Sequence, residues 1–304
     1  MKKGFFSKNK VLGINMLYVL SVLPLIIYGF YKNGILVYQN GFMSLLLSLQ
    51  YLVIPIIIIV LSYVFEIYYY MGIKKEEGTS SVVNSIIPYI NVLCYLVCAP
   101  NDYLWLTIPL IVILDILIKF IDKYVTINQI ALFKCLLVGI MTLIGNLEYA
   151  NLYEASLTTQ VTEPSLLFLG NGIGAIGTTS TLCALIGYII LLFNSYYKKE
   201  IPIVAFIGYA IVSVIIYFVG GLSFNDILVN TFNSGIIFAL VYVASLSTAT
   251  PVVRSGRIIY SLVLGVLGAV MVNILKLNIG VYIVILVLGL LTPLFDKFKL
   301  SLGE

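Results

Sequence analysis

Apolar stretches of about 18 residues or more, long enough to cross a bilayer as an α-helix, recur along the whole chain. Only 10% of the 304 residues are charged and 61% are hydrophobic, and nearly all the charges lie in the gaps between the apolar stretches. A soluble fold needs polar residues on the outward face of every element, which this pattern does not provide. The sequence therefore predicts an all-α integral membrane protein.

We predict about ten transmembrane helices. Pro88, Asn91 and Asn233 interrupt the two least regular spans, and the glycine-rich opening of the sixth span is expected to be partly non-helical. The first span follows a basic N-terminus and is predicted to be retained rather than cleaved as a signal peptide. The expected spans are residues 11–31, 43–65, 82–99, 103–121, 129–147, 173–195, 202–219, 232–250, 258–275 and 279–295.

Basic residues gather in alternate gaps, as the positive-inside rule requires of cytoplasmic loops. They precede the first span and recur after every even-numbered span, whereas the opposite gaps contain only Lys32 and Lys276. The longest gap, between the fifth and sixth spans, contains three glutamates and no basic residue. The N- and C-termini are therefore predicted to be cytoplasmic, and this longest loop to be outside.

Five predicted spans precede the long loop and five follow it. An odd number of helices in each half would place two related halves in opposite orientations, as inverted repeats do. No clear residue-level repeat accompanies this count, so a single irregular bundle is an equal alternative. We divide the chain into an N-terminal five-helix half (1–147), an outer loop (148–172) and a C-terminal five-helix half (173–304).

Several kinds of chemistry are excluded or disfavoured by composition. The chain has no histidine, which removes histidine-based metal sites and Ser-His-Asp catalysis. Its lysines and arginines are distributed over many gaps rather than gathered on one face, so no nucleic-acid partner is expected. We expect no metal site, and we interpret the cysteines as packing residues, although two of them share a helical face and a thiolate pair is the less favoured alternative. The cysteines are Cys94, Cys98, Cys135 and Cys183.

The most polar segment is ASLTTQVTEPSLLFLGNGIGAIGTTS, residues 155–180, in which hydroxyl groups and glycines are concentrated. Its glycines permit close approach of the backbone and offer amide groups to an anionic or aromatic ligand at the start of a helix. Close helix packing through small residues is the structural alternative. The expected ligand-binding residues are Gly170, Asn171, Gly174, Gly177, Thr178 and Thr179.

Three charged residues fall inside predicted spans, where burying charge is costly. Asp115 and Lys119 are spaced to form an i, i+4 salt bridge, which we favour over a role in an ion path. Lys134 is expected to extend its side chain to the cytoplasmic face.

Two stretches of the C-terminal half resemble segments of a known family. LFLGNGIGAIGTTSTLCALIGYIILL at 167–192 is similar to LFLGNxGGSIGETSxLxxLIGxxxLL, and NSGIIFALVYVASLSTATPVVRSGRIIY at 233–260 is similar to SGGLLFGAFFMATDPVTxPxxxxGRxIY. The two patterns are those of RnfD and NqrB, the flavin-bearing membrane subunits of ion-translocating electron-transfer complexes. The chain is identified as a divergent member, because Thr178 and Thr250 stand where the family has glutamate and aspartate. The N-terminal half matches mainly in the positions of its spans, with Glu66 near a family glutamate.

In that family a threonine in the outer loop carries FMN through a phosphoester bond made by an ApbE-type flavin transferase. The family motif is close to Ser-Gly-Ala-Thr, and Ser156-Leu157-Thr158-Thr159 lies at the matching place. The resemblance therefore implies FMN on Thr159, with Ser156 as the second matching residue; an ordinary loop threonine is the alternative. A second, non-covalent riboflavin between helices is also implied.

The resemblance implies a membrane subunit that relays electrons through flavin in an Rnf- or Nqr-like complex, with Na⁺ or H⁺ translocation. Such a chain is a subunit of an ion-translocating oxidoreductase rather than an enzyme alone. Its expected partners are membrane lipid, other subunits of that type and the ApbE-type transferase, and its expected place is the bacterial cytoplasmic membrane. The alternatives are a flavin-free solute channel or transporter with a fold like that of urea transporters, or an extracellular electron-export subunit without ion pumping.

Overall fold

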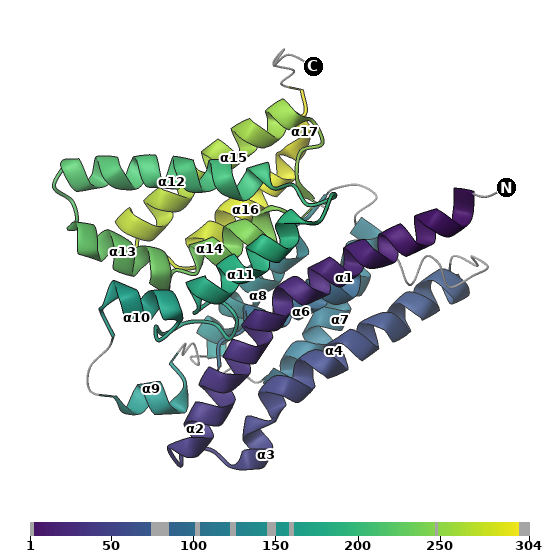
Figure 1. Cartoon of the computed structure of the whole chain (residues 1–304), viewed down its shortest axis with the longest axis horizontal. Coiled ribbons are helices and arrows are strands. Elements are labelled where there is room, and N and C mark those ends of the chain that lie inside the picture. The colour runs from purple at the N-terminus through teal and green to yellow at the C-terminus, as the bar shows by residue number, and fades with distance from the viewer. Residues whose placement is uncertain are drawn as a thin grey trace.

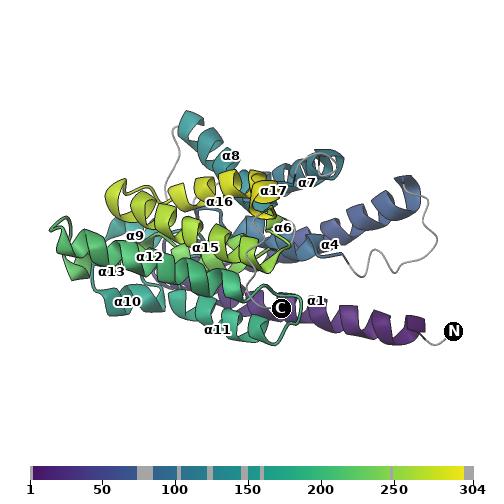
Figure 2. The same ribbon diagram turned by 90° about the horizontal axis from the view of Figure 1, so that it is seen from above.

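The computed structural model describes most of the chain, and the residues that it describes form helices and no strand. Figures 1 and 2 show the helices packed as one bundle, with α1 and α4 along one side and α12, α13 and α15 along the other. The described residues are 3–73, 85–100, 104–121, 126–144, 150–157, 161–246 and 249–297.

The helices include four π-helical segments, η1, η2, η3 and η5, each continuing an α-helix. The elements are α1 (Lys3–Phe30), η1 (Tyr31–Ile35), α2 (Leu36–Gln39), α3 (Leu45–Ser48), α4 (Gln50–Ile67), η2 (Tyr68–Ile73), α6 (Ile87–Leu96), α7 (Leu104–Ile121), α8 (Gln129–Ile144), α9 (Leu152–Ser156), α10 (Pro164–Leu169), α11 (Thr181–Leu192), α12 (Glu200–Phe218), α13 (Phe224–Asn233), α14 (Ile236–Phe238), η3 (Ala239–Ala244), α15 (Arg254–Ala269), η5 (Val270–Ile274), α16 (Gly280–Leu290) and α17 (Thr292–Phe295).

Five of the described helical stretches are long and apolar enough to cross a membrane, and a sixth qualifies if α13 is joined to α14 and η3 across a bend of 55°. Four more, α6, α8, α11 and α16, are apolar but shorter than the roughly 20 residues that a bilayer core requires. The all-helical class is confirmed. The count of ten complete spans, the inverted halves and the cytoplasmic termini stay predictions. The five long stretches are Met16–Gln39, Gln50–Gly72, Leu104–Ile121, Glu200–Phe218 and Arg254–Ile274.

The outside of the bundle is apolar and much of its inside is polar, as expected for a protein with lipid as its solvent. On α12 the residues Ile203, Ile207 and Ile211 recur every fourth position, and each is at least half exposed. In contrast, polar side chains such as Asn33, Asn91 and Asn128 are buried between helices. Surrounding lipid would cover the exposed face, while the buried amides find partners within the protein.

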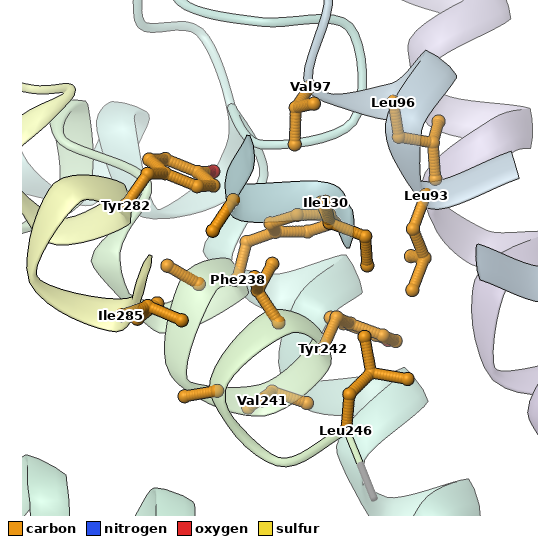
Figure 3. Packing of buried hydrophobic residues seen from close by; sticks show 14 of the residues in the cluster. Leu93, Leu96, Val97, Ile130, Phe238, Val241, Tyr242, Leu246, Tyr282 and Ile285 are labelled. Carbon is orange, nitrogen blue, oxygen red and sulfur yellow. The ribbon is translucent and has the colours of Figure 1, made fainter. Parts of the chain in front are cut away.

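The centre of the bundle is formed by the short helices. Figure 3 shows Leu93 and Leu96 of α6 beside Ile130 of α8, and Phe238 and Tyr242 of the α14–η3 helix packed against them. These side chains come from both the N-terminal and the C-terminal halves of the chain. The short helices therefore form the shared core in which the two halves meet.

Two breaks in helices bring backbone to the same region. Gly235, the N-cap of α14, has φ +64°, a conformation that L side chains rarely adopt, and a Cβ on it would lie 2.9 Å from the Cβ of Thr178. Residues 173–180 are also non-helical, as predicted, and α11 starts only at Thr181 behind the N-cap Ser180. The two non-helical segments thus lie against each other inside the bundle.

Candidate functional site

A polar pocket of about 270 Å³ lies where the glycine-rich segment meets the break between α13 and α14. Lys134 of α8 comes from the N-terminal half, and the other lining residues lie between Val161 and Tyr282, so the pocket is built mostly by the C-terminal half and closed by one side chain of the N-terminal half. Of the predicted ligand-binding residues, Gly174 and Thr178 line the pocket. Its lining is Lys134, Val161, Ile173, Gly174, Ala175, Thr178, Asn233, Ser234, Asn278 and Tyr282.

The glycine-rich segment is anchored by two backbone hydrogen bonds to the end of α6. The amide of Ile176 donates to the carbonyl of Cys98 at 2.9 Å, and that of Gly177 donates to the carbonyl of Leu96 at 2.8 Å. A Cβ at position 177 would lie 2.7 Å from the Cβ of Leu96. The amide of Gly177 was expected to meet a ligand, but it is used by the protein itself. Gly177 serves the close crossing of two segments instead.

Side chains complete the hydrogen bonding of both interrupted helices. The ammonium of Lys134 donates to the carbonyl of Val97, just beyond α6, at 2.5 Å. The side-chain Nδ2 of Asn128 donates to the carbonyl of Val243 in η3 at 2.8 Å, and its Oδ1 accepts from the backbone amide of Ala131. Carbonyls at the end of a helix lack partners within that helix, so these donors satisfy them where water is scarce.

Lys134 does not reach the cytoplasmic face, and the prediction that it would is wrong. Its side chain is buried at 4% exposure, bonds to Val97 and lines the polar pocket. A buried ammonium creates a positive potential in a medium of low dielectric, where its effect on a nearby negative charge is strong. The pocket therefore favours a ligand that is, or becomes, negatively charged.

Two buried polar atoms at the pocket and just behind it have no hydrogen-bond partner among the described residues. They are the Oδ1 of Asn233, which lines the pocket, and the Oγ1 of Thr179, whose Cγ2 lies 3.1 Å from where a Cβ on Gly174 would be. Buried polar groups in proteins are nearly always satisfied. The unpaired oxygen of Asn233 is buried against Gly172, beside the pocket, and is a candidate partner for a hydrogen-bond donor.

Helix α9 is tied to η1, the segment that continues α1, by a buried ion pair. The ammonium of Lys32 lies 2.9 Å from the Oε1 of Glu154 and also donates to the carbonyl of Gly172. In addition, the side chains of Asn151 and Asn33 are hydrogen bonded at 3.2 Å. These contacts hold the start of the predicted flavin-attachment segment beside the glycine-rich segment.

The attachment segment itself is described only in part. Ser156 is the last residue of α9, is exposed, and donates to the carbonyl of Tyr153 at 2.6 Å, so it does not line the pocket. Thr159 lies outside the described residues. Val161, two positions further along the chain, lines the pocket.

Gly170 and Asn171 lie at the end of α10 rather than in the pocket lining. Gly170 has φ +118°, and a side chain there would clash with the ring of Tyr28. The Oδ1 of Asn171 accepts from the Tyr28 hydroxyl at 3.4 Å. The structure thus gives both residues a role in packing α10 against α1.

A second group of buried charges lies between α4 and α7. The predicted pair of Asp115 and Lys119 is confirmed, with 3.7 Å between its charged atoms, and Lys119 also contacts the Oε1 of Glu66. The second oxygens of Glu66 and Asp115 are buried without a hydrogen-bond partner among the described residues. Sequence spacing revealed the local pair but not Glu66, which lies 53 residues before Lys119.

A second cavity, of about 380 Å³, lies among α10, α11, α12, α13 and η3 and is almost entirely apolar. Its walls include Phe168, Leu185, Phe206 and Phe232, and few polar groups face it. The polar edge of a riboflavin needs several hydrogen-bond partners, so this cavity does not suit the predicted non-covalent riboflavin.

Apolar exteriors, helices broken inside the bundle, and a polar pocket built where the breaks meet define a multi-pass helical membrane protein with an internal polar site. The chain belongs to the NQR2, RnfD, RnfE family, whose model matches residues 5–301. This confirms the resemblance found in the two C-terminal stretches.

Among curated proteins, the chain is similar to the D subunit of the proton-translocating ferredoxin:NAD(+) oxidoreductase complex of Clostridium ljungdahlii. The two are 28% identical over 132 residues, which are 43% of this chain and 40% of the relative. The matched part thus spans less than half the length of that relative.

Proposed function

We propose that this chain is a membrane subunit of an Rnf- or Nqr-type electron-transport complex in the bacterial cytoplasmic membrane, and that it relays electrons through FMN carried on Thr159. The complex would couple this transfer to movement of Na⁺ or H⁺ and would contain further subunits. The observation that carries the proposal is the polar pocket, whose lining includes Lys134 and also Val161, two residues beyond Thr159. Membership of the family supports it.

The residues of the pocket suit the ring system of a flavin. Asn233 has an unpaired acceptor oxygen beside the pocket, Lys134 brings positive charge, and Tyr282 adds an aromatic wall. The volume of about 270 Å³ lies just below the usual range of about 300–1,000 Å³ for ligand pockets. The pocket thus has room for a planar ring, with a ribityl phosphate remaining outside. Bound FMN would supply reversible electron transfer, while the protein supplies position and electrostatics.

The pocket residues have separate roles in this proposal. The ammonium of Lys134 stabilises negative charge in the pocket, and its bond to Val97 fixes where that ammonium lies. The unpaired oxygen of Asn233 would orient a ligand by accepting one hydrogen bond once the side chain turns toward the pocket. Gly174 keeps the wall of the pocket clear of side-chain atoms.

Covalent labelling tests the attachment point. We would express the chain with an ApbE-type transferase and look for flavin fluorescence on a denaturing gel, where only covalent flavin remains. Wild type and Thr158→Ala should fluoresce, and Thr159→Ala should not. A dark wild-type band, with the transferase active on a control substrate, would refute covalent flavin. The flavin-free channel or transporter would then become the leading function.

A second measurement tests the pocket separately from the attachment. Lys134→Met should leave covalent labelling intact but lower the midpoint potential of the flavin, because reduction adds electrons that the ammonium stabilises. Lys199→Met removes an exposed lysine elsewhere and serves as the control. Equal potentials in the two variants would show that the flavin is not held beside Lys134. If the chain serves electron export without ion pumping, the labelling of Thr159 and the lowered potential of Lys134→Met should both still be seen. Vesicles containing the complex should then take up no ions during electron transfer.

A further inference from the structure

The loop between α11 and α12 places one lysine against a tight turn of the chain that follows η3. The ammonium of Lys198 donates to the carbonyls of Thr250 and Pro251, each at 3.3 Å, and to the hydroxyl of Thr250. Three oxygen atoms from two adjacent residues thus surround one positive charge. Thr250 is buried, and Lys198 is partly buried.

The shape of this turn is fixed by contacts that do not involve Lys198. The Oδ1 of Asp296, just after α17, accepts from the amides of Val252 and Val253 at 2.8 and 3.0 Å. The ring of Pro251 further restricts the backbone. The oxygen atoms of the turn therefore keep their arrangement when the side chain of Lys198 is removed.

The oxygens around Lys198 are of the kind that bind a monovalent cation. Two carbonyls and a hydroxyl are neutral, whereas sites for divalent cations in proteins are usually built with carboxylates. An ammonium has three N–H donors and no acceptor, so three oxygens match it fully. Arg257, a neighbouring cation, is paired with Glu200 at 2.8 Å.

We propose that the Thr250–Pro251 turn is a monovalent-cation site that this chain fills with the ammonium of its own Lys198. While that lysine is charged, free K⁺ or Na⁺ has no place in the turn. When the ammonium is absent, the same oxygens bind a free cation. This site is distinct from the flavin pocket, and its test needs no flavin, so its outcome is independent of the proposed function.

Electrostatics around Lys198 make the exchange measurable in the wild type. Burial, followed by the charge of Arg257, lowers the pKa of Lys198 to about 8, against the opposing effects of Asp296 and Glu200. Among the described residues, these three groups, from α15, the end of α17 and α12, are the charges that act on it. Above that pH the turn loses its ammonium.

The test measures thermal unfolding of the purified full chain in choline chloride and in KCl or NaCl at equal ionic strength. Near neutral pH, wild type should have the same Tm in choline chloride as in KCl or NaCl, and so should Lys199→Ala. Lys198→Ala should unfold at a lower Tm in choline and regain about 3 °C or more in K⁺ or Na⁺, with saturation. Choline is too large for the turn and serves as the ionic-strength control.

Two further arms keep the inference open to refutation if Lys198→Ala fails to fold. Wild type above the pKa of Lys198 should acquire the same saturable response to K⁺ or Na⁺. Adding Thr250→Val to Lys198→Ala should abolish the response, since it removes one oxygen and leaves two carbonyls. If K⁺ or Na⁺ gives neither Lys198→Ala nor alkaline wild type more stability than choline does, the turn is not a cation site and Lys198 merely caps it.

Discussion

Breaking the ion pair between Lys32 and Glu154 should destabilise the chain far more than an exposed ion pair would. Both side chains are about nine-tenths buried, and the carboxylate and ammonium are 2.9 Å apart. Removing one partner of a buried pair costs about 3–5 kcal/mol because the other charge stays buried alone. Lys32→Met and Glu154→Gln should therefore each lower Tm by about 6 °C or more.

The double variant separates the ion pair from its surroundings. With both charges gone, the remaining loss should be about 1 kcal/mol, because the carbonyl of Gly172 no longer receives the hydrogen bond from Lys32. The coupling between the two sites should thus exceed about 2 kcal/mol in thermal unfolding of the detergent-purified chain. Additive effects of the two substitutions would refute the buried pair as the tie between α9 and η1.

Three further outcomes are expected in the same unfolding assay. Gly187→Ala should lower stability by about 1–3 kcal/mol, because the added methyl would overlap the hydroxyl of Tyr242. Gly139→Ala is the control, since its methyl meets nothing within 4 Å and should not destabilise the chain. Equal losses of stability in the two variants would contradict this. The pKa of Lys198 is about 8 in the folded chain and about 10.5 in the unfolded chain, so between these pH values the unfolded chain holds more protons and the contribution of Lys198 to stability should rise with pH. The free energy of unfolding of wild type and of Lys198→Ala should therefore diverge over this pH range. Parallel dependence on pH would contradict the lowered pKa. Lys119→Met should cost about 3–5 kcal/mol because two buried carboxylates lose their cation, and a change under about 1 kcal/mol would contradict that.

Hydropathy was enough to locate the long helices, because lipid selects for apolar surface over a fixed length. The spans expected at 103–121 and 202–219 match α7 and α12 closely. Hydropathy did not give the helix boundaries where tertiary contacts satisfy the polar backbone. The span expected at 232–250 is broken at Ser234 and Gly235, because that backbone packs against Thr178 from another part of the chain.

The candidate site was only partly accessible to sequence reasoning. Glycine and hydroxyl content pointed to the segment that forms one wall of the pocket, and Gly174 and Thr178 are there. Lys134 was missed, since the snorkelling rule considers only the distance to the end of the helix. Its partner, the carbonyl of Val97, comes from a different helix and has no signal in the local sequence.

The reciprocal anchoring of the interrupted helices has a consequence for how the protein is made. Leu96 and Cys98 emerge from the ribosome well before Ile176 and Gly177, whose amides satisfy their carbonyls. Until that later segment arrives, the carbonyl of Leu96 lacks the amide of Gly177 and must find a temporary partner, because an unpaired carbonyl in lipid costs several kcal/mol. The carbonyl of Val243, in contrast, finds Asn128 already synthesised. Assembly of the N-terminal half is therefore completed only by the C-terminal half, and a chain truncated between them would expose polar backbone that membrane quality control can recognise.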